Sequence, residues 1–267
     1  EFYTAFTPYQ PEMSQGTLQA TFEYQSMMCA LTGMDAANAS HYDGATSLAE
    51  AVTMTLEVTR NKRKKIILSH GINPQYRAVV RTYRQNSDLE IVGDEGAASV
   101  DELLDQLDDN TAMLAVSYPN FFGQIEDLHH IAERVHAAGA LFVVVTNPMA
   151  LGLFKSPGEL GADIVVGEGQ SAGIPLSYGG PYIGFFATRD KYVRKIAGRI
   201  IGETVDMDGK RAFVMTLRPR EQDIRREKAT SNICTNQGLM ALAAGVYLSL
   251  MGKNGMRHVA KLNYHKA

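Results

Sequence analysis

The sequence has 267 residues, of which 45% are apolar and 21% are charged, and its formal net charge is −3. These proportions are typical of globular proteins and exclude the collagen-like, coiled-coil and intrinsically disordered classes. The mild acidity disfavours nucleic acid as a partner, and the apolar runs fall far short of the ~20 residues of a membrane helix, so no membrane partner is expected.

The cysteine content and the chain ends bear on location and completeness. Cys29 and Cys234 are too few and too far apart for a disulfide scaffold or a thiolate metal centre. We therefore expect a reducing, cytoplasmic location. The chain begins at Glu1 with neither a methionine nor a signal-peptide pattern. It is expected to be part of a longer protein.

The chain divides into three expected segments. Residues 1–15 form an extended arm, because Pro8 and Pro11 disfavour a helix. Residues 16–245 form one large α/β domain. Residues 246–267 begin a C-terminal segment that is expected to be truncated.

Helices come first in the large domain. Apolar residues recur at helical spacing over residues 18–31, and Gly33 ends that helix. A second helix is expected over residues 48–58, opened by the segment 43–47. The basic run 60–65 follows and is expected to be a solvated cap that complements the helix dipole.

From residue 65 onward, strands and helices alternate. Apolar runs predict strands over residues 65–69, 89–92, 112–116, 141–145, 162–166 and 182–187. Helices are expected over residues 73–85, 100–107 and 128–138. Apolar strands separated by helices predict a mostly parallel sheet of six or seven strands, covered on both faces.

Ligands of such sheets bind at the carboxyl ends of the strands. The residues at those positions are Ser69–Gly71, 117–120, 146–148 and 167–170, which supply amides, hydroxyls, glycines, one histidine and one glutamate. No serine-hydrolase pattern occurs among them. His70 directly follows a strand and is either a functional or a structural histidine.

Other candidate motifs each have two interpretations. Asp43 and Gly44 begin a helix that either binds an anion or is simply capped by Asp43. Gly179 and Gly180 indicate a tight turn or the close approach of another backbone. The histidines of the helix 128–138 lack the companion ligands of a metal site, so no metal is expected.

Three segments carry a resemblance to a known family. They are residues 9–16 (YQPEMSQG), 36–40 (AANAS) and 220–235 (REQDIRREKATSNICT). The sequence resembles the P-protein, or glycine dehydrogenase (decarboxylating), of the glycine cleavage system along essentially its whole length. Within that family it is most similar to the α half of the split bacterial form.

The resemblance implies a fold, a cofactor and partners. The fold is the large domain of pyridoxal-phosphate fold type I, the aspartate-aminotransferase type. The partner is glycine dehydrogenase subunit 2, in an α2β2 assembly. The complex decarboxylates glycine with pyridoxal phosphate and passes the aminomethyl group to the lipoyl group of H-protein.

In that fold an acid ends one central strand and a Schiff-base lysine follows the next. Here the first strand runs into Thr146 and Asn147, and there is no lysine between Lys155 and Lys191. The lysine position falls on Gln170 or Ser171. We therefore expect no catalytic and no cofactor-binding residue, with pyridoxal phosphate in the partner subunit. The candidates for the degenerate pocket are Asp43, Gly44, Thr46, His70, Thr146, Asn147, Gln170 and Ser171.

A second set of residues is expected at the partner interface or at a pocket wall. The charged segment 218–228 leads into the polar, uncharged segment 229–237, a plausible pocket wall. The candidates are Gly179, Gly180, Arg220, Arg225, Arg226, Thr230, Ser231 and Asn232. Two alternatives stay open: an autonomous pyridoxal enzyme that uses Lys155 or Lys191, and a small-molecule binding module with a repurposed pocket.

Overall fold

The structure is a computed structural model that describes residues 15–233 and 237–267. The expected arm, apart from Gln15, and Cys234 lie outside the described residues. Within them, none of the helices has the length and hydropathy needed to cross a membrane.

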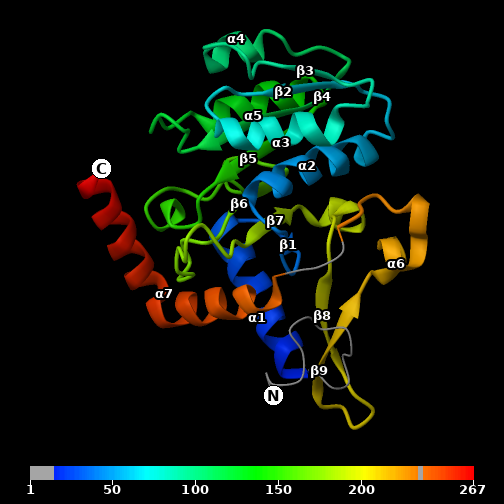
Figure 1. Cartoon of the computed structure of the whole chain (residues 1–267), viewed down its shortest axis with the longest axis vertical. Helices are drawn as coiled ribbons and strands as arrows, with labels where there is room; N and C mark the ends of the chain where they lie inside the picture. The colour runs from blue at the N-terminus through cyan, green and yellow to red at the C-terminus, as the bar shows by residue number, and fades with distance from the viewer. Residues whose placement is uncertain (1–14, 234–236) are drawn as a thin grey trace.

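A seven-stranded sheet lies at the centre of the molecule, with the strand order β1-β7-β6-β5-β4-β2-β3 (Figure 1). The strands are β1 (Ala36–Ala37), β2 (Lys65–Leu68), β3 (Glu90–Val92), β4 (Thr111–Tyr118), β5 (Leu141–Thr146), β6 (Ile164–Glu168) and β7 (Gly184–Thr188). Strands β2 to β6 are parallel, whereas β7 runs antiparallel to β6 and β1 antiparallel to β7. This arrangement confirms the predicted mostly parallel α/β sheet.

Helices cover both faces of the sheet. The helices of the described residues are α1 (Gln15–Thr32), α2 (Gly44–Val58), α3 (Pro74–Arg84), α4 (Val100–Leu104), α5 (Leu128–Ala137), α6 (Gln222–Arg225) and α7 (Gly238–Lys266), with short 3-10 turns η2 (Ala150–Gly152), η3 (Asp190–Lys195), η4 (Arg218–Arg220) and η5 (Arg226–Lys228). The helix predicted over residues 100–107 was wrong at its end, since α4 stops at Leu104.

The core forms on the two sides of the sheet by strand alternation. Phe142 and Val144 of β5 pack with residues of α1, α5 and α7 on one face. Val143 and Val145 pack with residues of α2 and α3 on the other face. Because both faces are covered, the central strands have continuous apolar sequences.

An antiparallel hairpin, β8 (Ile200–Val205) and β9 (Arg211–Thr216), stands apart from the central sheet (Figure 1). Its apolar side packs on α1, where the rings of Phe22 and Phe213 lie 5.4 Å apart. The sequence analysis did not predict this hairpin. Its stabilising contacts join residues almost 200 positions apart, which a local pattern does not reveal.

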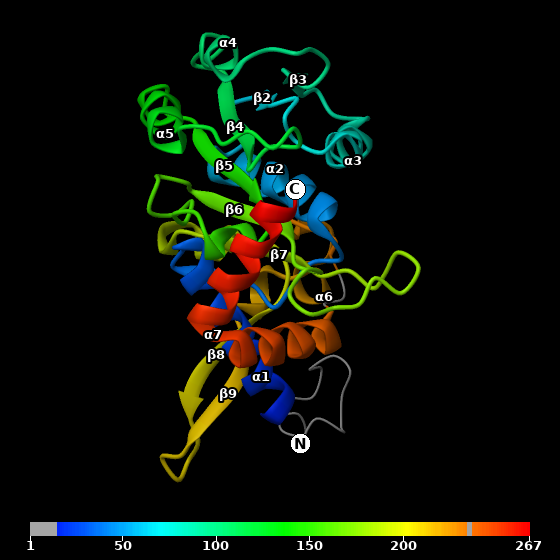
Figure 2. The same ribbon diagram turned by 90° about the vertical axis from the view of Figure 1, so that its left-hand side faces the viewer.

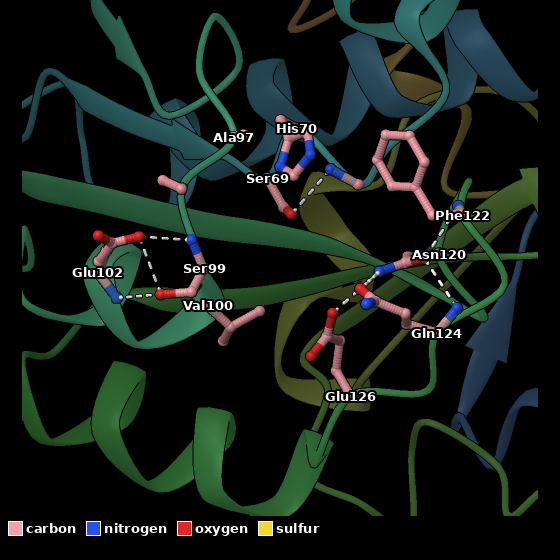
Figure 3. Close-up of a pocket in the computed structure, with 12 residues that line it drawn as sticks. Ser69, His70, Ala97, Ser99, Val100, Glu102, Asn120, Phe122, Gln124 and Glu126 are labelled. Atoms are coloured by element: carbon pink, nitrogen blue, oxygen red, sulfur yellow. Dashed lines mark hydrogen bonds between the residues drawn. The ribbon is translucent and has the colours of Figure 1, made fainter.

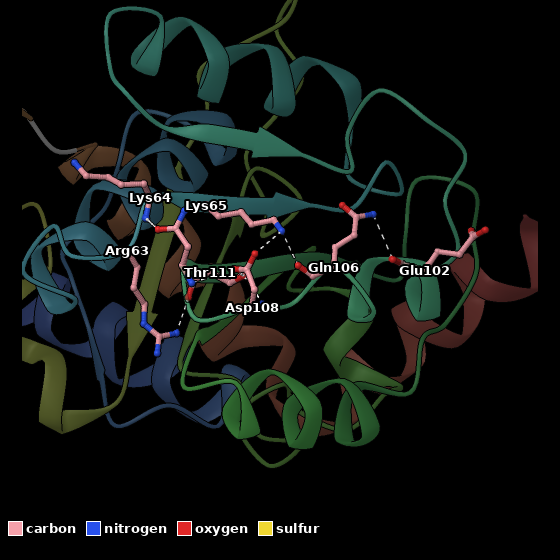
Figure 4. Close-up of polar contacts among 8 residues, drawn as sticks. Arg63, Lys64, Lys65, Glu102, Gln106, Asp108 and Thr111 are labelled. Atoms are coloured by element: carbon pink, nitrogen blue, oxygen red, sulfur yellow. Dashed lines mark hydrogen bonds and ion pairs between the residues drawn. The ribbon is translucent and has the colours of Figure 1, made fainter.

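The basic run 60–65 serves the sheet, and the prediction of a solvated helix cap was wrong for Arg63 and Lys65. Arg63 Nη1 donates to Thr111 O at 2.8 Å (Figure 4) and to Ala138 O at 2.9 Å. Lys65 Nζ donates to the backbone oxygen of Gln106 at 2.7 Å and to Asp108 at 3.0 Å. Arg63 thus links the segment before β2 to the start of β4 and to the turn before β5, and Lys65 links β2 to the segment before β4.

The C-terminal helix α7 packs on α1 and bends sharply (Figure 2). The bend lies at Gly252, whose φ of 54° is in the left-handed region that glycine adopts readily. The predicted boundary at residue 246 falls inside this helix.

Candidate functional site

The expected acid and lysine positions meet at the carboxyl ends of β5 and β6. Ser171 Oγ donates to Asn147 Oδ1 at 2.8 Å, and Thr146 Oγ1 donates to Tyr118 O at 2.5 Å. Gln170 Nε2 donates to Pro181 O at 3.2 Å. The structure thus brings these four candidate residues into one neighbourhood, and the groups they present are uncharged.

Glu168, at the end of β6, is a site residue that sequence reasoning missed. Its carboxylate accepts hydrogen bonds from the backbone N–H groups of Gly44 at 3.0 Å, Gln170 at 2.9 Å and Ile183 at 3.0 Å. Burial raises the pKa of Glu168, while these three N–H groups lower it. The sequence did offer one signal for it, because Glu168 is the single acidic residue in the four segments that follow the predicted strands.

The start of α2 shows Asp43 as an N-cap. Asp43 Oδ1 accepts from Thr46 N–H at 2.7 Å, and the side chain of Thr46 bonds back to complete a capping box. Gly44 N–H is used by Glu168. Hence the N–H groups of Gly44 and Thr46 are already bonded to carboxylates of this chain.

These residues do not fit pyridoxal phosphate. The ring of that cofactor needs an acid against its nitrogen and a lysine for its aldehyde, whereas the corresponding positions hold Asn147 with Thr146 and Gln170 or Ser171. Its phosphate needs free donors, yet Glu168 and Asp43 engage the start of α2.

The two lysines of the autonomous-enzyme alternative lie elsewhere. Lys191 Nζ is 3.4 Å from Asp163, which precedes β6, whereas Gln170 follows the other end of that strand. Lys155 lines a groove between α1 and α7. Neither lysine shares the neighbourhood of Asn147 and Ser171.

His70 belongs to a separate cavity of about 450 Å³ at the carboxyl ends of β2 and β4 (Figure 3). Its ring lies tilted against that of Phe122, with centroids 5.0 Å apart, and its buried Nδ1 has no hydrogen-bond partner among the described residues. Asn120 Nδ2 donates to Glu126 at 3.0 Å and thereby holds the loop that forms one wall. The cavity is lined by Ser69, His70, Gly71, Ala97, Ala98, Ser99, Val100, Glu102, Asn120, Phe122, Gln124 and Glu126.

Gly179 and Gly180 lie in the loop that joins β6 to β7 and projects from the body of the molecule (Figure 2). Gly179 has a φ of 105°, and a Cβ at either glycine would meet nothing within 4 Å. The structure therefore shows a turn, and no other backbone of residues 15–233 and 237–267 comes close to it. The same loop exposes Leu176 and Tyr178 fully or nearly so.

Of the three arginine candidates, one side chain is directed into the protein and two are exposed to solvent. Arg220 donates to Ile196 O and to Gly198 O, each at 2.5 Å, and burial lowers its pKa. Arg225 and Arg226 are exposed. Arg220 thus fastens the charged segment to the loop that precedes β8.

Thr230 and Ser231 line one small pocket, beside Arg220, and Asn232 lines another, beside Thr46 and Glu50 of α2. Ser231 hydrogen-bonds the buried carboxyl of Glu50, whose pKa is raised chiefly by burial. The position of these three residues agrees with a pocket wall, but they lie apart from the cavity that contains His70.

Metal ligation finds no support within residues 15–233 and 237–267. No group of three or more His, Cys, Asp or Glu side chains converges there. The histidines of α5 pair with carboxylates one by one, as His136 does with Asp163 at 2.8 Å.

Comparisons with known proteins identify relatives along the whole chain. The family model described as glycine cleavage system P-protein matches residues 1–267. The probable glycine dehydrogenase (decarboxylating) subunit 1 of Desulforamulus reducens is 61% identical over 269 residues, and that of Thermomicrobium roseum is 58% identical over 271 residues. Each match covers 100% of this chain and 60% of the relative. The chain therefore spans about 60% of the length of these relatives.

Solved structures confirm the expected fold. A crystal structure of glycine decarboxylase (P-protein) of the glycine cleavage system, in inhibitor-bound form, has a TM-score of 0.89 and 48% identity, and covers 97% of this chain and 58% of that one. Sphingosine-1-phosphate lyase of Burkholderia pseudomallei K96243 has a TM-score of 0.64 and 14% identity, over 97% of this chain and 60% of that one. The second likeness shows the fold alone.

Proposed function

This chain belongs to the glycine cleavage system P-protein family, and on that premise we propose that it is the non-catalytic subunit of a glycine-decarboxylating complex. The complex acts as a glycine dehydrogenase (aminomethyl-transferring), an oxidoreductase that releases carbon dioxide and passes the aminomethyl group to the lipoyl group of H-protein. Its partner is glycine dehydrogenase subunit 2, in an α2β2 assembly.

The observation that carries this proposal is the uncharged contact between Ser171 and Asn147. It occupies the place where the family resemblance expects a lysine and an acid. Pyridoxal phosphate, bound in the partner subunit, supplies the electron sink for decarboxylation. The residues of this chain then contribute a surface that closes the partner's site against water and orients its loops.

The surface proposed to meet the partner lies along the carboxyl edge of the sheet. Two loops there expose large apolar side chains, which a protein surface seldom gathers without a partner. One loop follows β4 and the other joins β6 to β7; their exposed residues are Phe121, Phe122, Ile125, Leu176, Tyr178 and Tyr182. Gly179 and Gly180 lie in the second loop, so these interface candidates fit this surface. The cytoplasmic location of the complex stays a prediction.

The test is a visible absorbance spectrum with pyridoxal phosphate, recorded for this chain alone and after addition of subunit 2. We expect no band from a lysine-bound cofactor with this chain alone. The band and the release of carbon dioxide from glycine should appear in the mixture. A band on a reducible lysine of this chain alone would contradict the proposal.

The cavity around His70 favours a second candidate function, a small-molecule binding module. A partly enclosed space of about 450 Å³ with a buried, unpaired imidazole nitrogen is suited to a small polar ligand. Its acidic residues, Glu102 and Glu126, favour neutral or cationic ligands over anions. A rise in melting temperature with a small amine or amino acid, absent in His70→Ala, supports this function; no rise with any of them excludes it.

A further inference from the structure

The carboxylate of Glu168 is held by backbone N–H groups from three separate segments. Oε2 accepts from Gly44 N–H in the first turn of α2, and Oε1 accepts from Gln170 N–H and Ile183 N–H, all within 3.0 Å. Converging backbone N–H groups at a helix start are the kind of site that binds phosphate groups. Here a side chain of the same chain provides the anion.

Glu168 lies beside the positions where the family resemblance expects the cofactor. It precedes Gln170 by two residues and Ser171 by three, and these two are the candidates for the lysine position. The backbone also approaches α2 very closely here, since a Cβ on Gly44 would lie 2.7 Å from Glu168 N. The end of β6 and the start of α2 are therefore locked together around this one carboxylate.

The surroundings of the carboxylate are acidic or phenolic. Asp43 adds to the effect of burial in raising the pKa of Glu168, and Glu168 adds to the effect of burial in raising the pKa values of Tyr24 and Tyr76. A phosphate group beside Glu168 would face repulsion from two carboxylates and find the three N–H groups already engaged. Glu168 and an external phosphate thus compete for the same donors.

We propose that Glu168 is an internal substitute for a phosphate group. Its carboxylate fills an anion site formed by Gly44, Gln170 and Ile183, and thereby keeps inorganic phosphate and phosphate esters, pyridoxal phosphate among them, out of this chain. This inference rests on the proposed function for the place of the cofactor, and it extends that function by naming the group that excludes it.

The experiment removes the carboxylate and offers inorganic phosphate to the chain without its partner. Calorimetric titration and phosphorus NMR compare the parent chain with Glu168→Ala. We expect the variant to bind phosphate at least about tenfold more tightly, with pyridoxal phosphate competing for the same site. Glu57→Ala is the matched control, because Glu57 lies at the other end of α2 and pairs with Lys195 at 3.3 Å. Its phosphate affinity should equal that of the parent.

Equal phosphate affinity in the parent chain and in Glu168→Ala would overturn the proposal, as would an equal gain in Glu57→Ala. If Glu168→Ala folds poorly, Glu168→Ser keeps a short polar side chain and still vacates the anion site. Phosphate should then raise the melting temperature of Glu168→Ser and leave that of the parent unchanged; no rise overturns the proposal. These measurements involve neither subunit 2 nor glycine. The role of Glu168 can therefore be disproved while the proposed subunit assignment stands, and the subunit assignment can be disproved while the role of Glu168 stands.

Discussion

Charged side chains have different roles at the two ends of the parallel strands, here called the amino edge and the carboxyl edge of the sheet. At the amino edge, Arg63 and Lys65 reach backbone oxygens and a carboxylate that belong to distant segments. At the carboxyl edge, the neighbourhood of Asn147 and Ser171 presents uncharged groups, and Glu168 is satisfied by backbone N–H groups. The side chains that stabilise the sheet are therefore not the ones at the positions where catalytic residues are expected. A sheet can therefore keep its architecture while the residues for catalysis are absent.

The largest expected effect on stability comes from a substitution at the amino edge. Arg63→Ala removes two charged hydrogen bonds and leaves the oxygens of Thr111 and Ala138 short of a donor. We expect a loss of about 2–4 kcal/mol in the free energy of unfolding, measured by urea denaturation. The exposed Arg60, three residues earlier, is the control: Arg60→Ala should change stability by less than about 0.5 kcal/mol. Equal losses in both variants would show that the contacts of Arg63 contribute no stability.

A pH titration sharpens the comparison at the carboxyl side. Burial lowers the pKa of His41 to about 3, and this ring stacks on Phe186 next to the start of β7. In the unfolded chain, His41 takes up a proton near pH 6.5, as an ordinary histidine does. In the folded chain it takes up this proton only near pH 3. Stability is therefore retained above pH 6.5 and lost as the pH falls through this window.

Between pH 7 and pH 4.5 this linkage costs about 2–3 kcal/mol, measured by denaturation at each pH. His41→Asn should flatten that slope, whereas the exposed His129→Asn should leave it unchanged. An unaltered slope in His41→Asn would assign the acid sensitivity to other groups.

A smaller effect concerns the exposed side chains of the carboxyl edge. Tyr178 is fully exposed and has a φ of 60°, a conformation that asparagine accepts readily. Tyr178→Asn should leave the stability of the isolated chain unchanged and weaken binding to subunit 2 by about tenfold, the loss expected for a tyrosine near the centre of an interface. Met207, equally exposed at the tip of the β8–β9 hairpin, gives the control Met207→Ser. If both variants bind subunit 2 equally well, the loop between β6 and β7 is not part of the interface.

The smallest effect is expected for the hydrogen bond between Ser171 and Asn147. Both residues are exposed, so water replaces the lost partner. Ser171→Ala should change the free energy of unfolding by less than about 0.5 kcal/mol in urea denaturation. A loss as large as that of Arg63→Ala would mean that the carboxyl edge also holds the frame.

Local patterns predicted the frame well and the charged contacts poorly. The apolar runs of β5 and β6 and the helix that Asp43 opens depend on neighbours in the sequence, so they were confirmed. The partners of Arg63 lie 48 and 75 residues away, and Gly44 lies 124 residues from Glu168. No periodicity encodes such distances. The roles of the uncharged site candidates stay predictions, because under the proposed function they act together with a partner chain.

The bonds of Glu168 also constrain how this chain and a cofactor-binding relative could be converted into one another. A lysine introduced first at position 170 or 171 would stand beside an anion site that Glu168 already fills, and would gain no phosphate-bearing cofactor. Removing Glu168 first would leave three backbone donors unsatisfied until a phosphate arrived. The two substitutions are therefore epistatic, and each single step is neutral or harmful. Under the proposed function, such a barrier would preserve the difference between this chain and a cofactor-binding subunit.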